Sequence, residues 1–337
     1  MTSNPISAAE NSDLDVLHTA FDTNFTWNYG TQKEGLRALY EKAKTEQWNG
    51  AELAWDSPVE PEGDIIPQVF NPLQDYAPYK KLSAKEKARF KHGQLAWTLS
   101  QFLHGEQGAL MAASQLVTAV PWMDAKYYAA TQTVDEARHV EVFDRYLREK
   151  LEWEWPINTN LKGLLDLILI DSRWDVKYLG MQILVEGLAM AAFANMYQMC
   201  QEPLLKSLVY NAMRDESRHV AFGVLSLRGY YTDMEASELR DREDFLITAC
   251  ELMRDRLVGE DLAEEFGMDR AEVRQVVLES PVMAQFRQFL FMRVVPNVKQ
   301  LGLLTPRVRS AFENLEIIQF EDINTDNLDR QMGLTVP

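Results

Sequence analysis

Cysteines and basic side chains are both scarce in this chain of 337 residues. Cys200 and Cys250 are its only cysteines, which excludes a disulfide framework and any metal site built mainly from thiolates. Lysine and arginine number 34 against 51 aspartates and glutamates, so the net charge is −17 with neutral histidines. Because nucleic-acid-binding surfaces need basic stripes to neutralise phosphates, we expect no nucleic-acid partner.

Targeting and membrane segments are missing as well. Residues 1–13 lack the basic start and the apolar core of a signal peptide, and no apolar run approaches the ~20 residues needed to span a bilayer. The alternation of apolar and polar residues that is typical of strands is also absent. With 46% hydrophobic and 25% charged residues, the composition is that of a globular protein. We expect a cytoplasmic protein without a membrane partner, since two cysteines suit a reducing compartment.

Proline density divides the chain into regions. Five of the 13 prolines lie within residues 49–81, a density that no helix tolerates, so this stretch is predicted to be a long connection. Residues 1–32 are polar and aperiodic, which predicts an arm that is either mobile or laid over the body. Residues 33–317 are predicted to form a single helical domain, with a central bundle at about 82–229 and a C-terminal tail at 318–337.

Between these breaks the sequence predicts helices only. Ser83 followed by Glu86 has the pattern of a capping box, which marks the start of a helix. Pro121, Pro156 and Pro203 interrupt otherwise proline-free stretches, so each marks a helix boundary. The predicted helices cover residues 33–44, 83–120, 122–151, 161–170, 172–201, 203–229, 243–258, 269–279 and 282–301. The fold class is therefore all-α.

An internal repeat lies on four of these helices. Residues 135–140 (DEARHV) and 215–220 (DESRHV) are nearly identical. Glu106 and Glu186 are as far apart in the sequence as these two segments are. Glu106 also precedes Glu136 by as many residues as Glu186 precedes Glu216. Gly105 and Gly187 adjoin these two glutamates, which suggests either a close helix approach or a π-bulge.

The equal spacing has a geometric explanation. Glu106 lies 15 residues before Pro121 and Glu136 lies 15 residues after it, so in a helical hairpin each is ~22 Å from the turn. Glu186 and Glu216 are likewise centred on Gln201, two residues before Pro203. Four helices are therefore predicted to bring four carboxylates to one level.

Two histidines complete a candidate metal site. Positions i and i+3 share a helix face, so each Glu-x-x-His pair can point at one ion or at two adjacent ions. Carboxylate and imidazole ligands together suit iron or manganese, whereas zinc usually takes four or fewer ligands and calcium avoids imidazole. The predicted ligands are Glu106, Glu136, His139, Glu186, Glu216 and His219.

A single Glu-x-x-His motif is most often a solvated pair on a surface helix, so the pattern has to be weighed as a whole. Glu106 and Glu186 each lie on an apolar helical stripe, where Leu103 and Ile183 are among their neighbours. Buried ionised carboxylates are very costly unless they are paired or bind metal. The repeat and the apolar stripes together favour a buried metal site.

The residues beside the ligands predict a second layer of contacts. A metal-bound imidazole needs an acceptor for its other ring N–H, and an aspartate on a neighbouring helix can supply one. We expect Asp135 to hold His219 and Asp215 to hold His139. Arg138 and Arg218 either neutralise these aspartates or are ordinary surface residues; the sequence leaves both interpretations open.

On these residues the chain resembles the ferritin-like diiron carboxylate superfamily. The resemblance is to the branch that contains ribonucleotide reductase small subunits, their ligand-binding oxidase relatives and bacterial multicomponent monooxygenase hydroxylases. The paired Asp-Glu-x-Arg-His is most similar to the monooxygenases, while residues 39–44 with Trp48 resemble the reductase type. The resemblance implies a ferritin-like four-helix bundle with additional flanking helices.

Several positions depart from the patterns of that branch. Phe143 replaces the tyrosine of radical-storing subunits, which implies that no tyrosyl radical is stored there. Met181 and Ala109 replace the tyrosine and valine of the cross-linked oxidases, so that cross-link cannot form. Met190 replaces the threonine of monooxygenase hydroxylases, and Ala212 replaces the additional histidine of arylamine N-oxygenases.

The resemblance also implies cofactors and partners. These are two iron ions, with Mn/Fe as the alternative, O₂ as co-substrate, and an external electron donor such as a ferredoxin or a reductase. No G-x-G-x-x-G nucleotide fingerprint is present, which agrees with an external donor. The apolar residues one turn from the ligands are either the lining of a substrate pocket or plain core. They are Leu103, Leu110, Phe143, Ala189, Met190 and Phe193.

Two classes of function follow. The first is an enzyme, a dinuclear iron oxidoreductase that activates O₂ and oxygenates or oxidises a small organic substrate in an apolar pocket. The second is a metal protein without an organic substrate, either a ferroxidase or a non-radical partner protein like a ribonucleotide reductase small subunit. A homodimer is one expected assembly.

Overall fold

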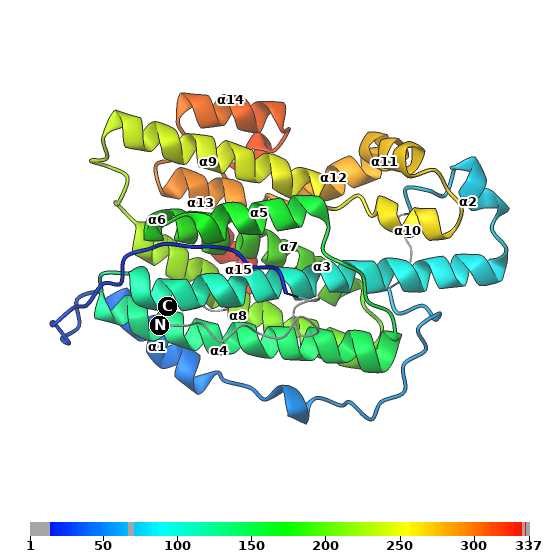
Figure 1. Ribbon diagram of the computed structural model, residues 1–337, viewed down its shortest axis with the longest axis horizontal. Coiled ribbons are helices and arrows are strands. Elements are labelled where there is room, and N and C mark those ends of the chain that lie inside the picture. Colours follow the sequence, from blue (N-terminus) through cyan, green and yellow to red (C-terminus); the bar gives the residue numbers. More distant parts are fainter. Residues whose placement is uncertain (1–13, 67–70, 332–333, 335–337) are drawn as a thin grey trace, which may run out of the picture.

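Two helical hairpins form the centre of the molecule. A computed structural model describes residues 14–66, 71–331 and 334. In the first hairpin α3 (Ala84–Ala119) runs antiparallel to α4 (Met123–Tyr146), and the two helices pack along their length (Figure 1). The capping box starts α3 as predicted, because the Ser83 hydroxyl accepts a hydrogen bond from the Glu86 N–H and the Glu86 carboxylate accepts one from the Ser83 N–H.

The second hairpin contains a wider helical segment. Its first arm is continuous through α6 (Trp174–Tyr178), the π-helical segment η3 (Leu179–Val185) and α7 (Glu186–Met199), and α8 (Pro203–Leu227) returns beside it. The predicted helix over 172–201 therefore exists, with a π-helical region directly before Glu186. This agrees with the π-bulge that was one of the two expectations for the helix containing Gly187. The other expectation, a close helix approach, is not met at Gly105, since no described atom outside its own helix backbone lies within 4 Å of the position of a Cβ.

The first arm of this hairpin is long and apolar. By length and composition, the stretch Trp174–Met199 could span a membrane, which was not predicted from the sequence. Within the fold, 89% of its most apolar window is buried. Its apolarity is explained by its place at the centre of the bundle, where neighbouring helices cover it on all sides.

The N-terminal region lies over the bundle. Residues 14–33 have no helix or strand, and their described contacts include the Asn24 N–H donating to the Thr118 carbonyl at 2.9 Å. The N–H groups of Gln32 and Lys33 donate to the buried carboxylate of Asp124. The described part of the arm is thus laid on the body, and α1 (Glu34–Thr45) then packs across α4 and α8.

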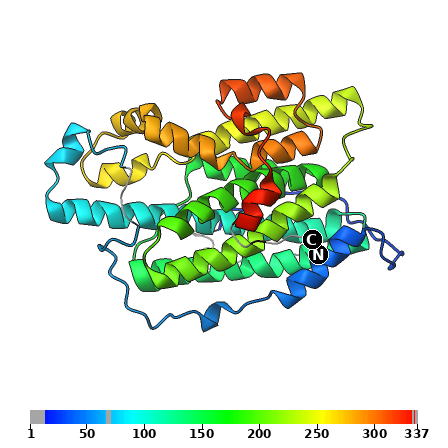
Figure 2. The same cartoon turned by 180° about the vertical axis from the view of Figure 1, so that it is seen from behind.

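Most of the remaining helices lie on one side of the bundle (Figure 2). Among these, α5, α9 and α11 correspond to predicted helices. The helix predicted over 282–301 is divided into α12 and α13 by residues 291–293. The short helices α2, α10, α14 and α15 were not predicted. Their bounds are α2 Ala77–Lys81, α5 Thr159–Ile170, α9 Ala236–Asp255, α10 Glu260–Glu265, α11 Arg270–Glu279, α12 Pro281–Leu290, α13 Val294–Gln300, α14 Pro306–Asn314 and α15 Thr325–Gln331.

The all-α class is confirmed, since no strand occurs in the part of the chain that the structure describes. One hydrophobic core runs from α1 to the C-terminal helices. The described tail also packs on the body, where Arg293 pairs with Asp329 at 2.6 Å. The flanking helices thus enclose the central bundle rather than forming a separate core.

Candidate metal centre

The six predicted ligands meet at one level of the bundle. Glu106 comes from α3, Glu186 begins α7, and each Glu-x-x-His pair lies on α4 or α8. All six side chains are buried, and the most exposed of them, Glu106, is only 6% exposed. The structure therefore brings together every residue of the predicted set.

These side chains form two overlapping groups. Glu106 and His139 belong to the first group and Glu186 and His219 to the second, while Glu136 and Glu216 belong to both; within each group the donor atoms lie within 4.8 Å of one another. The overlap gives each group one private glutamate, one private histidine and two shared carboxylates. This is the arrangement expected for two adjacent ions bridged by carboxylates.

The shared glutamates reach both histidines with different oxygens. Glu136 places Oε2 3.3 Å from Nδ1 of His139 and Oε1 3.1 Å from Nδ1 of His219. Glu216 places Oε1 and Oε2 3.2 Å from the same two nitrogens. The two imidazoles lie on opposite sides of the shared carboxylates, each with Nδ1 turned inward.

The donor set fits divalent cations. Three buried carboxylate oxygens have no hydrogen-bond partner among the described residues: Glu136 Oε2, Glu186 Oε2 and Glu216 Oε1. Two of them face only Nδ1 of His139, at 3.2–3.3 Å, and a buried carboxylate oxygen without a hydrogen bond costs several kcal/mol or more. Two cations would compensate this cost, and the mixture of oxygen and nitrogen donors suits iron or manganese.

Each histidine is held by the aspartate of the opposite repeat. Nε2 of His139 lies 3.1 Å from Oδ2 of Asp215, and Nε2 of His219 lies 3.3 Å from Oδ2 of Asp135. The structure thus makes both contacts of the crossed pairing that the sequence suggested. With the Nε2 proton donated to aspartate, Nδ1 is left as the nitrogen that can bind a metal.

The two arginines of the repeats are buried beside these aspartates. Arg138 contacts Asp135 and Asp215, and Arg218 contacts the same pair. Their exposed fractions are 8% and 1%. Of the two interpretations open from the sequence, the structure supports neutralisation of the aspartates.

Trp48 and Gln47 complete this outer layer, although no sequence pattern predicted a role for them in the centre. Trp48 Nε1 donates to Asp215 at 2.8 Å, and its ring stacks near His139 with centroids 6.5 Å apart. Gln47 donates to Asp135 at 3.0 Å and accepts from Arg138 at 2.7 Å. All of these contacts join segments that are far apart in the sequence, so no local pattern could have shown them.

Two buried glutamines lie beside the ligand set, one in direct contact with it and one behind the first. Gln132 Nε2 donates to Glu186 Oε1 at 2.7 Å and to Glu136 Oε1 at 3.0 Å. Gln182 donates to Gln132 at 3.4 Å. Each glutamine precedes a predicted ligand by four residues, which places it one helical turn away on the same face.

The charges of the metal-free centre perturb its titration. Burial raises the pKa of Glu106 to about 8, and the neighbouring charge of Glu216 adds to this. Burial also raises the pKa of Glu186 well above its usual value. For His139, burial alone would lower the pKa, but the charge of Glu106 and the hydrogen bond to Asp215 raise it well above its usual value. The centre therefore retains protons that cations would have to displace.

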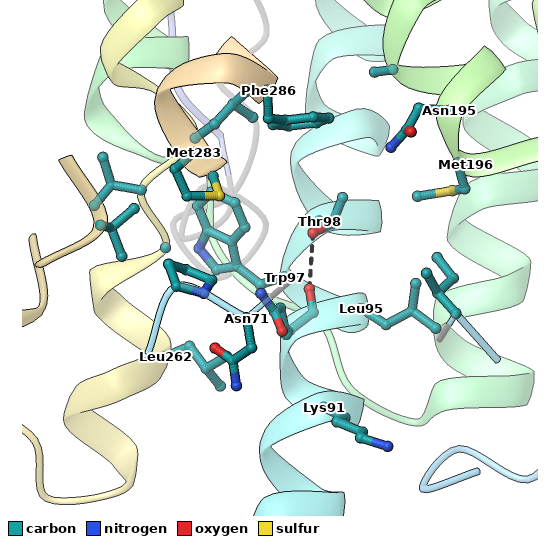
Figure 3. A pocket seen from close by; sticks show the side chains of 18 of the residues that line it. Asn71, Lys91, Leu95, Trp97, Thr98, Asn195, Met196, Leu262, Met283 and Phe286 are labelled. Carbon is teal, nitrogen blue, oxygen red and sulfur yellow. Dashed lines mark hydrogen bonds between the residues drawn. The ribbon is translucent and has the colours of Figure 1, made fainter. Parts of the chain in front are cut away.

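A cavity lies beside this centre, but not where the sequence placed it (Figure 3). It has a volume of about 490 Å³, and none of the six predicted pocket residues lines it. Its inner wall includes Phe102 and Leu188, each one residue away from a predicted position. The predicted Phe143 and Phe193 instead stack on each other with centroids 5.8 Å apart, and Phe102 meets the ring of Phe193 at 5.0 Å. These aromatic rings fill the space between the ligands and the cavity.

Comparisons with known proteins agree on the fold. No protein-family model matches this chain, and no curated protein matches it. Among solved structures it is similar to an R2-like ligand-binding oxidase with an aerobically reconstituted metal cofactor, with 18% identity, a TM-score of 0.51, and coverage of 82% of this chain and 99% of the other. It is also similar to dimanganese(II)-NrdF of Streptococcus sanguinis, with 14% identity, a TM-score of 0.52, and coverage of 86% and 99%.

Proposed function

We propose that this chain is a dinuclear-metal oxidoreductase that activates O₂ and oxygenates or oxidises a small organic substrate. The observation that carries the proposal is the pair of ligand groups that share Glu136 and Glu216. A single shared carboxylate could be a chance contact in a buried cluster. Two shared carboxylates, each directing its two oxygens at different histidines, are the arrangement that two adjacent ions would need.

The chain's own residues would organise this centre. Two iron ions, or one manganese and one iron, would supply the binding and reduction of O₂ when bound. Glu106 with His139 and Glu186 with His219 would hold the separate ions, and Glu136 with Glu216 would hold them together. Asp135 and Asp215 keep the Nε2 protons of the histidines in place, which orients both rings.

The surroundings exclude water and offset charge. Arg138 and Arg218 offset the two aspartates, which would otherwise add negative charge beside four glutamates. On the other side, the rings of Phe102, Phe143 and Phe193 form an apolar wall that would protect a reactive centre from water. We infer from this division that substrate approaches from the aromatic side.

We further propose that electrons come from an external ferredoxin or reductase, and that the protein acts in the cytoplasm, as a homodimer if it associates. Phe143 is fully buried at the position where radical-storing relatives have tyrosine. This supports direct attack on substrate instead of storage of a radical at that position.

The test is anaerobic loading with Fe(II), followed by a pulse of O₂ and spectroscopy with and without candidate substrates. We expect uptake of two ions per chain and a transient absorbance that decays faster in the presence of substrate. Rapid oxidation that no organic compound accelerates would instead indicate a ferroxidase. A persistent tyrosyl radical signal would indicate a reductase-type partner subunit.

A further inference from the structure

A row of aromatic rings leads away from the metal centre on the side of His219. The ring of Tyr128, on α4, lies 6.5 Å from the ring of His219 and 4.5 Å from the ring of Phe222 on α8. The ring of Phe222 in turn lies 4.8 Å from that of Tyr178 on α6. These distances join ring centroids and are those of aromatic side chains in packing contact. Three helices thus place a continuous row of rings beside one predicted ligand.

The row continues to the surface. The ring of Trp174, one turn before Tyr178 on α6, lies 5.9 Å from it, and the ring of Tyr230 lies 4.6 Å from that of Trp174. Tyr230 is 37% exposed, whereas Tyr128, Phe222 and Tyr178 are fully buried. These five residues, here called the aromatic row, therefore connect the buried centre to solvent without an aliphatic side chain between them.

The aromatic side chains on the two sides of the centre differ in redox chemistry. The wall that faces the cavity is made of Phe102, Phe143 and Phe193, and a benzene ring is very hard to oxidise. Four of the five rings in the aromatic row are phenols or an indole, which give up an electron far more readily. Its single phenylalanine, Phe222, touches a tyrosine on each side. The row is thus suited to carrying an electron, and the wall is not.

We propose that electrons from the external donor enter at Tyr230 and Trp174 and reach the metal ions through Tyr178, Phe222 and Tyr128. For each electron that passes, the donor is oxidised by one electron and one bound metal ion is reduced by one electron. Each ring regains the electron that it passes on, so no bond in the row is made or broken. The proposal rests on the proposed function, and it keeps the reductant and the substrate on different sides of the centre.

The experiment withdraws an electron from the centre by light. Both native cysteines are buried, so a Thr232→Cys substitution at an exposed position two residues from Tyr230 gives one accessible thiol. The probe is a ruthenium tris-bipyridine maleimide on that thiol, flashed with a Co(III) quencher in the full chain loaded with Mn(II), without O₂. The flash produces Ru(III), which takes one electron from Mn(II) and returns to Ru(II). The loss of the Mn(II) EPR signal per flash is the readout, because a route that couples two sites carries an electron in either direction.

Four labelled proteins are compared. We expect Trp174→Leu and Tyr178→Leu to lose most of the Mn(II) oxidation seen without them, because each removes a ring from the row. Trp122→Leu is the matched control, since the ring of Trp122 packs 5.4 Å from that of Trp174 but contacts no other ring of the row. It should oxidise Mn(II) as well as the protein that carries the label alone. Equal metal content in all four proteins shows that the bundle is intact.

Each result decides the route. Loss of Mn(II) oxidation in both row variants, with oxidation retained in Trp122→Leu, supports it, and equal oxidation in all four proteins overturns it. Unattached ruthenium complex can approach every face of the molecule. If this free complex oxidises Mn(II) equally in wild type and in Trp174→Leu, electrons enter elsewhere, for example at Trp48 beside His139, and the assignment is wrong.

The same measurements separate this proposal from the proposed function. They require bound metal but no O₂, so a chain that carries electrons along the row and does not consume O₂ would keep the route and lose the oxygenase assignment. A chain that consumes O₂ while Trp174→Leu conducts normally would keep the oxygenase assignment and lose the route. Failure to bind Mn(II) would contradict both, and elemental analysis would show it before any flash.

Discussion

The two ends of the metal centre have matching ligands but different surroundings. At the Glu106 end, α3 is a regular helix, and Phe102 one turn away lines the cavity that holds Arg256. At the Glu186 end, the π-helical segment η3 precedes the ligand, and Gln132 donates to its carboxylate at 2.7 Å. An internal repeat can thus reproduce a ligand set without reproducing what encloses it.

This asymmetry gives each end a separate task. The Glu186 end is closed by Gln132, Gln182 and the fully buried Tyr128, whose ring packs 4.5 Å from Phe222. The Glu106 end has only an aromatic wall between the ligands and an apolar cavity. We infer that the closed end anchors the centre and the open end receives substrate.

Removing a shared glutamate should have the largest effect. Glu136→Ala takes a ligand from both groups, so elemental analysis after reconstitution should find well under one ion per chain. Glu106→Ala and Glu186→Ala each remove a private ligand and should leave about one ion. Glu141→Ala, at an exposed glutamate of the same helix, is the matched control and should retain two. Equal metal content in Glu136→Ala and Glu106→Ala would show that the ions are not bridged as proposed.

The metal-free protein should lose stability as the pH rises. The raised pKa of Glu106, about 8 against the usual 4.5, means that the folded state binds this proton more tightly than the unfolded state. That contribution is present at low pH and is lost between these two values, at up to about 1.4 kcal/mol per pH unit for one group. The raised pKa of His139 acts in the same direction.

Thermal unfolding across this pH range measures the effect. The unfolding temperature of metal-free protein should fall from about pH 5 to about pH 9, and Mn(II)-loaded protein should be much less sensitive because the cations replace the protons. Metal binding near pH 7 should also release protons, which a weakly buffered indicator solution would detect. A metal-free protein whose stability rises over the same range would contradict the burial argument.

Changes to the aspartates should have an intermediate effect. Asp135→Asn and Asp215→Asn each weaken the hold on one imidazole, and loss of such a contact typically costs 10- to 100-fold in metal affinity or activity. The two costs should be similar, since Asp215 also accepts from Trp48 and Asp135 also accepts from Gln47. Competition titration with a chromophoric chelator would measure both affinities. Native affinity in both variants would mean that the aspartates do not position the histidines.

Gln132→Leu should have the smallest effect and should separate the two ends. It removes two hydrogen bonds at the closed end, each worth about 0.5–1.5 kcal/mol. Because these bonds are also made without metal, only part of that energy enters the metal affinity, and the weaker of the two affinities should fall by about tenfold or less. Phe102→Leu at the open end should leave both affinities unchanged and alter substrate binding instead. Calorimetric titration with Mn(II) compares the two variants. If Phe102→Leu weakened the metals as much as Gln132→Leu, the division of tasks would be wrong.

The sequence by itself determined the elements and the donor set. Helix boundaries at Pro121 and Pro203 and the capping box at Ser83 are local features, so they could be located without a fold. The level of Glu106 and Glu136 follows from the rise per residue, and the pairing of Glu136 with His139 follows from helical periodicity. That these residues bind metal remains a prediction, but their convergence required only regular helices in two hairpins.

Tertiary structure alone decided what surrounds that donor set. Trp48 reaches Asp215 across 167 residues of sequence, and Arg256 reaches the neighbourhood of Glu106 from a different helix layer. None of the predicted pocket residues lines the cavity, because the space left between separate helices is not set by distance from the ligands along one helix. Local periodicity sets which side of a helix a residue occupies, whereas burial, cavities and unpaired charges arise only when separate elements pack together.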